Sequence, residues 1–312
     1  MITWPNNKKF AFTIIDDTDK ASINNIKPVY DYLYKSGLIT TKTIWALPSK
    51  DKFGGQSICD KEYREFIKDL VDKGFEIALH GVGSGDYNRE ETLYGIKLIN
   101  ETFNRIPKIH INHAHNSDNI YWGEKRFVYP IDKIYKYLRH IAKRKSIISL
   151  GDEDNSKYFW GDFCKKNIKY IRNMVFSDIN TISCDKYMPY KEKRKEKYSN
   201  YWFSSSDGYN CETLIKLLSN ENIDKLEKEN GCSIVYTHFA YGFVNEKGEL
   251  NKEFKECIDY LSSKNGWFVP ASQILDYLNN NKNNNYISQF QLIKLNIKWF
   301  YERIIRKIFG GI

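Results

Sequence analysis

Short apolar runs rich in β-branched residues alternate with amphipathic segments along most of the chain. The runs have the length of buried strands, and the segments between them carry apolar residues at helical spacing. We predict strands at residues 10–15, 40–47, 75–79, 108–112, 146–150, 170–176, 201–205 and 233–239. We predict helices near residues 24–35, 60–73, 89–103, 131–143, 211–219 and 252–263. This alternation is typical of an α/β fold with a mostly parallel sheet, and eight strand candidates favour a barrel.

The last part of the chain has a different pattern. Residues 278–285 are rich in asparagine and indicate a linker, so we divide the chain into residues 1–280 and residues 281–312. Apolar residues recur at helical spacing at positions 290, 293, 297, 301, 304 and 308. This spacing predicts a basic amphipathic helix within residues 286–309, which could lie on an anionic membrane, cover the barrel or join two subunits.

Charge and cysteine content narrow the classes of protein. The formal net charge is +9, but residues 186–197 carry six basic and two acidic residues, and residues 286–309 carry five basic residues and one glutamate. Each segment is therefore +4 and the rest of the chain is close to neutral, so we expect no nucleic-acid partner. The six cysteines are scattered without a CxxC pair, which indicates reduced thiols. The start of the chain lacks the pattern of a secretory signal, so we expect a cytoplasmic protein, with membrane association through residues 286–309 left open.

Reactive polar residues fall where the predicted strands end. They are Asp16, Asp17, His80, His113, His115, Asp152 and His238. In parallel α/β sheets, ligands bind at the carboxyl ends of the strands, where the loops converge. Core packing does not explain why so many separate segments deliver a carboxylate or an imidazole there, so we predict a functional site.

Two adjacent carboxylates, Asp16 and Asp17, follow the first predicted strand in the sequence FTIIDDTD. In regular pleating they point to opposite faces, but a turn can bring both to one rim. One can then bind a metal ion while the other acts as a base toward water. An Asx-turn or the cap of the next helix is the structural alternative.

Histidines supply the other candidate ligands. His80 ends a strand and is followed by a glycine-rich stretch in which the backbone can bend, and a neutral imidazole there suits zinc. His113 and His115 are two residues apart, so an extended segment would place both on one face as a chelating pair. His110 has the opposite parity and more plausibly packs or faces solvent. A hydrogen-bonding role for His80 and a polar loop around residues 110–115 are the alternatives.

Two further residues complete the candidate set. His238 follows an apolar strand among aromatic residues, and a partly desolvated imidazole facing a carboxylate makes a usable general acid. Arg172 lies within another apolar strand and needs a partner, because its charge is costly to bury. That partner could be a catalytic aspartate or a purely structural one.

In this order, the motifs resemble those of the NodB-homology polysaccharide deacetylases, carbohydrate esterase family 4, and most closely their WbmS-type branch. The resemblance covers residues 8–280 and implies a distorted (β/α)7-type barrel. It implies that Asp16 is the base and Asp17 a metal ligand, since the family's strand end supplies the two in that order. It also implies that His80 is a metal ligand and His238 the general acid, and that Arg172 orients Asp16.

The sequence departs from the family pattern at two places. Ser84 stands where the second metal histidine of the H-[ST]-x-x-H motif belongs, and NHAHN replaces an arginine-proline motif after the fourth strand. His113 or His115 could supply the missing ligand. We place Ser84, Asn116 and Arg172 among the substrate-binding or orienting residues.

We therefore predict a metal-dependent deacetylase that hydrolyses an N-acyl, acetamido group on a sugar or sugar precursor in surface-polysaccharide biosynthesis. Its metal, zinc in our prediction, would be bound by Asp17, His80, His113 and His115, with Asp16 and His238 as base and acid. One alternative is a catalytically degenerate carbohydrate-binding module on the same scaffold, which needs no metal. Another is a metal-dependent hydrolase or isomerase acting on a non-sugar amide.

Overall fold

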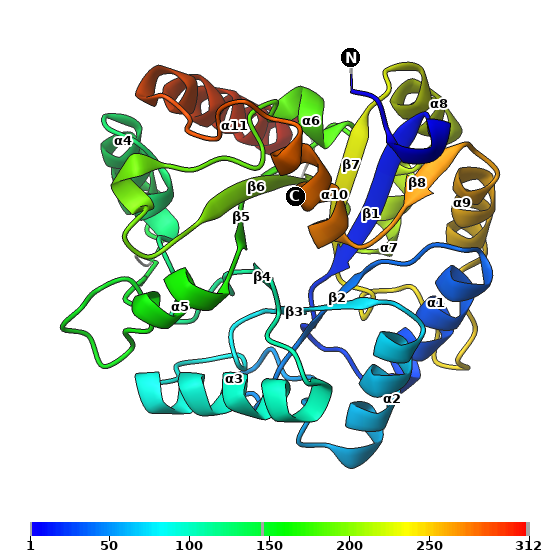
Figure 1. Ribbon diagram of the computed structural model, residues 1–312, viewed down its shortest axis with the longest axis horizontal. Helices are drawn as coiled ribbons and strands as arrows, with labels where there is room; N and C mark the ends of the chain where they lie inside the picture. The colour runs from blue at the N-terminus through cyan, green and yellow to red at the C-terminus, as the bar shows by residue number, and fades with distance from the viewer. Residues whose placement is uncertain (1, 145–146, 310–312) are drawn as a thin grey trace.

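Parallel strands close into a barrel at the centre of the computed structural model, which describes residues 2–144 and 147–309 (Figure 1). The barrel strands are β1 (Phe10–Asp16), β2 (Thr41–Ile44), β3 (Glu76–Leu79), β4 (Ile109–His110), β5 (Tyr170–Phe176), β6 (Tyr201–Asp207) and β7 (Cys232–Thr237). They neighbour one another in chain order, and β1 pairs with both β7 and β2, which closes the ring. The sequence-based prediction of a distorted (β/α)7-type barrel is confirmed.

The distortion is visible at β1. An additional strand, β8 (Gly266–Phe268), pairs with Phe10–Phe12 in the first half of β1. The strand β2 pairs with Ile15 and Asp16 in the last part of the same strand. One strand therefore has three parallel neighbours.

Helices surround the barrel (Figure 1). They are α1 (Ile23–Lys35), α2 (Lys61–Asp72), α3 (Arg89–Phe103), α4 (Ile131–Ile141), α5 (Gly161–Asn167), α6 (Thr181–Cys184), α7 (Cys211–Leu217), α8 (Asn220–Lys228), α9 (Lys252–Ser262), α10 (Ala271–Asn280) and α11 (Gln289–Phe309). Short 3-10 turns lie at η1 (Pro5–Asn7), η2 (Gly123–Arg126) and η3 (Lys193–Lys195). Capping residues determine where several helices begin. At the start of α3, Asn88 Oδ1 accepts a hydrogen bond from the Glu91 backbone N–H, and the Glu91 carboxylate accepts one from the Asn88 backbone N–H.

Alternation along β1 separates two apolar cores. Ala11 and Ile15 join residues of β3, β4, β5, β6 and β7 in one cluster, which only the barrel interior can bring together. Phe10, Phe12 and Ile14 belong to the other cluster, with the helices packed outside the barrel. Odd-numbered residues of β1 therefore face inward and even-numbered residues face the helices.

One predicted strand is wrong. Residues 147–150 form no strand, and residue 146 lies outside the described part of the chain. The segment instead runs beside the loop after β4, where Leu150 N–H donates to the carbonyl of Ser117. An apolar run of strand length is thus used to cover a loop, and β4 pairs directly with β5.

The predicted C-terminal helix exists as α11, and it packs against β5 and α4. Its buried residues are Leu292, Leu295, Asn296 and Trp299, whereas Phe290, Ile297, Tyr301 and Ile304 of the predicted apolar stripe are exposed. Among the described residues, none of the helices combines the length and apolar character that a bilayer crossing requires. The division of the chain after residue 280, and contact of α11 with a membrane or a second subunit, stay predictions.

Candidate functional site

Four polar side chains meet just beyond the carboxyl ends of the barrel strands. Oδ1 of Asp19 lies 3.4 Å from Nε2 of His80 and 3.4 Å from Nε2 of His113. Oδ2 of Asp19 lies 3.3 Å from Nε2 of His238. All four side chains are buried, and Asp19 Oδ1 has no hydrogen-bond partner among the described residues.

The outer nitrogen of each imidazole fixes its orientation. Nδ1 of His80 lies 3.2 Å from the carbonyl oxygen of Ile111, and Nδ1 of His238 lies 3.0 Å from that of Tyr209. Nδ1 of His113 lies 2.9 Å from the amide oxygen of Asn116. Because these oxygens accept hydrogen bonds, each Nδ1 carries a proton and each Nε2 faces Asp19, where it offers a lone pair in a neutral ring and an N–H in a protonated one.

This donor set fits a divalent cation. The ligand atoms of Asp19, His80 and His113 all lie within 4.8 Å of one another. Two neutral imidazoles and a carboxylate are the ligands found in catalytic zinc sites, where a further position stays open for water or substrate. The residues present therefore agree with a resident metal ion.

The pKa values of Asp19, His113 and His238 are shifted because these clustered groups are buried close to one another. Burial opposes ionisation of Asp19, but the three imidazoles outweigh burial and hold its pKa far below the usual range. Burial also opposes charging of His113 and His238, yet the adjacent Asp19 raises the pKa of both rings. The ionised carboxylate of Asp19 and the protonated rings of His113 and His238 thus stabilise one another.

Asp17 lies beside the cluster and is paired with an arginine. Nη1 and Nη2 of Arg172 donate to its two oxygens at 3.0 and 2.5 Å, and Oδ2 is 3.8 Å from Nε2 of His80. Burial would raise the pKa of Asp17, but the charge of Arg172 outweighs it and the net shift is downward. The guanidinium itself lies 4.5 Å above the ring of Tyr236. The sequence-based expectation of an aspartate partner for Arg172 is met, but the partner is Asp17.

The surroundings of Asp16 do not fit the role of base that we expected. Its side chain points toward the helices, where Oδ2 accepts from Tyr30 and pairs with Lys42 at 2.9 Å. Its Oδ1 accepts from the Phe239 backbone N–H at 2.8 Å. Asp16 has the same parity as Ile14, so the regular pleat places it outside the barrel and Asp17 inside.

His113 and His115 do not form the chelating pair that we expected. His113 is buried in the cluster, whereas His115 is exposed and stacks on Phe53 with ring centroids 5.1 Å apart. The period-2 argument failed because β4 ends at His110 and the chain turns at Ala114 and His115. A tight turn does not preserve the side-chain alternation of a strand.

Ser84 and Asn116 support the cluster from behind. Ser84 Oγ donates to Asp51 at 2.6 Å and lies 3.5 Å from Nε2 of His113. Asn116 binds His113 through Oδ1 and donates through Nδ2 to the carbonyl of Gly83 at 2.9 Å. His113, from the loop after β4, thus lies next to position 84 in the cluster. Asp152 lies elsewhere, in an ion pair with Lys125.

The cluster opens into a pocket of about 230 Å³. Its lining contains Asp17, Asp19, His80, Asn112, His113, Ala114, Trp122, Arg126, Arg172, Val175, Tyr236, His238, Trp299 and Arg303. The sequence reading missed Asp19, although the motif DDTD places it two residues after Asp17. It also missed the aromatic and basic wall formed by Trp122, Arg126, Trp299 and Arg303, for which no local sequence signal existed.

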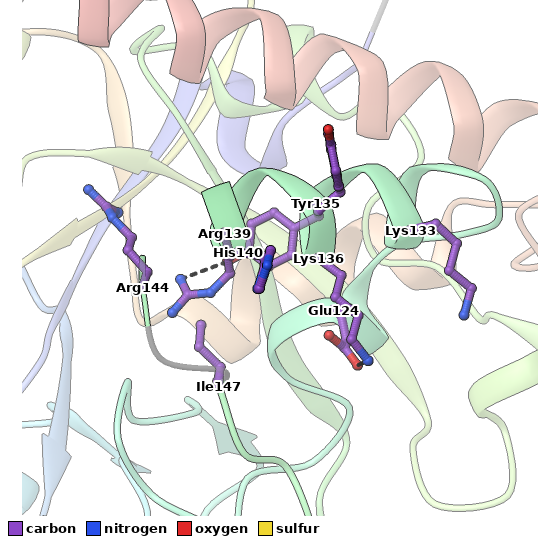
Figure 2. Close-up of a pocket in the computed structure, with 9 residues that line it drawn as sticks. Glu124, Lys133, Tyr135, Lys136, Arg139, His140, Arg144 and Ile147 are labelled. Atoms are coloured by element: carbon purple, nitrogen blue, oxygen red, sulfur yellow. Dashed lines mark hydrogen bonds and ion pairs between the residues drawn. The ribbon is translucent and has the colours of Figure 1, made fainter. Parts of the chain in front are cut away.

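A second pocket, of about 360 Å³, lies along α4 and is drawn in Figure 2. Its polar lining is mostly basic, with Lys136 close to Glu124. The full lining is Glu124, Lys133, Tyr135, Lys136, Tyr137, Arg139, His140, Arg144 and Ile147. Among the described residues this pocket holds no comparable group of ligands, and the grouped carboxylate and imidazoles place the candidate site in the barrel.

The fold has known counterparts among solved structures. A Mycobacterium smegmatis protein provisionally described as a polysaccharide deacetylase aligns with 92% of this chain and 96% of its own, with a TM-score of 0.54 and 11% identity. A Pseudomonas aeruginosa PAO1 protein with a similar provisional description aligns with 89% of this chain and 93% of its own (TM-score 0.51, 10% identity). The Puue allantoinase covers the same shares at a TM-score of 0.53 and 11% identity. No protein-family profile matches the sequence, and no curated protein is significantly similar to it.

These likenesses define the class of fold: a polysaccharide-deacetylase-type barrel, the NodB-like architecture. At such low identity they establish the fold alone.

Proposed function

We propose that this protein is a divalent-metal-dependent hydrolase that removes an acyl group from the nitrogen of an amino sugar. The observation that carries the proposal is the convergence of three Nε2 atoms on the carboxylate of Asp19, at 3.3–3.4 Å. The shared fold of the polysaccharide deacetylases supports the same reaction class.

In this proposal Asp19, His80 and His113 hold the metal ion, with zinc the best match to the ligand types. Asp19 thus takes the role that we first expected of Asp17. When bound, the ion would supply Lewis-acid chemistry, lowering the pKa of water and polarising the amide carbonyl.

The remaining side chains manage the protons. Asp17, kept ionised by Arg172, accepts a proton from the attacking water as its oxygen bonds to the acyl carbon. The C–N bond then breaks, and His238, whose pKa Asp19 raises, donates a proton from Nε2 of its doubly protonated ring to the leaving amine. Asn116 and Ser84 keep His113 in place throughout. Asp16 has no part in the chemistry, since both of its oxygens are engaged outside the barrel.

The experiment compares metal content and acetate release in three proteins: the parent chain, Asp19→Ala and His115→Ala. We expect about one divalent ion per parent chain by elemental analysis, and release of acetate from an N-acetylated sugar. Asp19→Ala should lose both, while His115→Ala should keep both because its ring lies outside the cluster.

A parent protein that binds sugar but neither binds metal nor releases acetate would instead indicate the carbohydrate-binding module. Release of product from simple non-sugar amides, but not from acetylated sugars, would refute the sugar specificity. A role in surface-polysaccharide biosynthesis is part of the proposal and follows from the resemblance to the WbmS-type branch.

A further inference from the structure

The wall of the catalytic pocket contains two arginines that the proposed hydrolysis does not use. Arg126 belongs to the turn η2 and Arg303 to the last helix, α11. Both line the same pocket as Asp19, His80 and His238. Two segments far apart in the sequence therefore bring positive charge to one side of the site.

Tryptophans hold the two guanidinium groups. Cζ of Arg126 lies 4.2 Å from the ring centroid of Trp122 and 5.2 Å from that of Trp299. Cζ of Arg303 also lies 5.2 Å from the Trp299 ring. Stacking on an indole fixes the plane of a guanidinium and leaves its N–H groups for a ligand.

Neither arginine has a carboxylate partner among the side chains that the structure describes. Arg126 is 92% buried, yet its partners are a backbone oxygen, that of Asn173 at 3.2 Å, and the phenol of Tyr135, and its Nε has no partner within the described chain. Asp207, the carboxylate whose charge acts most on Arg303, is already paired with Arg306. The indole N–H groups of Trp122 and Trp299 also lack partners within the described chain.

Burial makes this arrangement costly for Arg126 without an anion, whereas Arg303 is exposed and adds a second positive charge at the pocket wall. Burial lowers the pKa of Arg126 to about 10, and the charge of Arg303 adds to the effect, so Arg126 still carries its charge at neutral pH. A buried cation normally has a counter-ion, because desolvation is not otherwise offset. Guanidinium groups that approach from different elements suit a phosphate, which presents several oxygens in different directions, better than a planar carboxylate.

We propose that Arg126 and Arg303 form a subsite for a phosphate group of the substrate, so that the enzyme deacylates a phosphorylated amino sugar. This inference rests on the proposed hydrolase function for the identity of the reacting group. The pocket of about 230 Å³ has room for a limited part of a substrate, which agrees with a small phosphorylated precursor.

The test uses the full-length, metal-loaded protein and three substrates: N-acetylglucosamine, N-acetylglucosamine 1-phosphate and UDP-N-acetylglucosamine. We expect kcat/KM for one or both phosphorylated substrates to exceed that for the neutral sugar by about 10- to 100-fold, the range of one or two charge-assisted contacts. The ratio between the two phosphorylated substrates separates a monophosphate from a nucleotide diphosphate source.

The variant Arg303→Gln should abolish this preference, mainly by raising KM for the phosphorylated substrates. Arg303→Lys should restore part of it. Lys294→Gln is the matched control, because it removes one positive charge from the exposed side of the same helix.

Binding of inorganic phosphate, measured by calorimetry, separates the two hypotheses. Phosphate binding that weakens in Arg303→Gln but not in Lys294→Gln supports the subsite even if no substrate is hydrolysed. Equal hydrolysis of neutral and phosphorylated sugars, without phosphate binding, would overturn the subsite while the deacylase function stands.

Discussion

Asp16 and Asp17 are neighbours in the sequence but lie in different environments. Asp16 and Asp17 are both buried at the end of β1, but one pairs with Lys42 outside the barrel and the other with Arg172 inside it. The alternation of Phe12, Ile14 and Asp16 already indicated this division from the sequence. The order of residues in the resembled motif gave Asp16 the role of base, whereas the parity of β1 places Asp17, not Asp16, inside the barrel.

Other residues of the site could not be predicted in this way. His80 and His238 directly follow strands, so strand ends located them correctly. His113 and Asp19 lie in loops beyond the strand ends, where side-chain direction depends on tertiary contacts such as the bond between His113 and Asn116. Arg126 and Arg303 reach the pocket only through packing of distant segments, which no short motif encodes.

The ion pair outside the barrel leads to a stability prediction. Nζ of Lys42 and Oδ2 of Asp16 are 2.9 Å apart and both side chains are fully buried. Lys42→Met leaves the Asp16 charge without its partner, so we expect the free energy of unfolding to fall by about 3–5 kcal/mol. Urea denaturation followed by circular dichroism measures the change.

Lys27→Met is the matched control, because Lys27 forms an exposed pair with Asp31 one helical turn away. Its loss should cost at most about 1 kcal/mol. Equal costs for the two variants would show that the buried pair contributes no more than an exposed one.

At the scale of elements, strand and helix patterns were informative where a segment is long and one-sided. The boundaries of β5 and α3 match the predicted ranges, because apolar runs and capping residues are both present. The short helices α5, α6 and α8, the helix α10 and the strand β8 were missed, since few residues define their periodicity. The helix α11 was predicted, but its buried face was not, because apolar residues occur on both faces.

The packing of α11 can be tested directly. Leu295 is 3% exposed within the main apolar core, whereas Ile297 is 56% exposed. Leu295→Ala should lower the free energy of unfolding of the whole protein by about 2–5 kcal/mol, in one cooperative transition. Ile297→Ala is the control and should change it little.

Two separate transitions in the denaturation curve, with only the smaller one shifted by Leu295→Ala, would contradict this view. Residues 281–312 would then behave as an independent unit, as our division of the chain implied.

At the scale of the whole molecule, the alternation of strands and helices was enough to predict the barrel. Closure itself depends on pairing between β1 and both β2 and β7, which links the ends of the ring through long-range contacts. Sequence periodicity carries no direct record of such pairing. The general class of fold was therefore predictable, whereas the pairing of β1 with both β2 and β8 was not.

Buried titratable groups make the stability of the molecule depend on pH. Burial raises the pKa of Asp185 to about 6, although Ser204 donates a hydrogen bond to it at 2.7 Å. Because the folded-state pKa lies above the unfolded value, the contribution of Asp185 is fully present below about pH 4 and is lost as pH rises through 6. Asp185→Asn should therefore gain stability relative to the parent between pH 4 and pH 7.5, on the order of 1–3 kcal/mol.

Urea midpoints measured at several pH values give this difference. Parallel pH profiles for the parent and Asp185→Asn would show that the carboxyl group is not the titrating element.

The three neighbours of β1 have a consequence for the fidelity of folding. A slip of one position along this strand would move one of the two aspartates into the place of the other and leave either Lys42 or Arg172 without a carboxylate. Such a slip would have to break the ladders to β2, β7 and β8 together. Pairing with three strands therefore fixes the register of β1 on which the proposed chemistry depends.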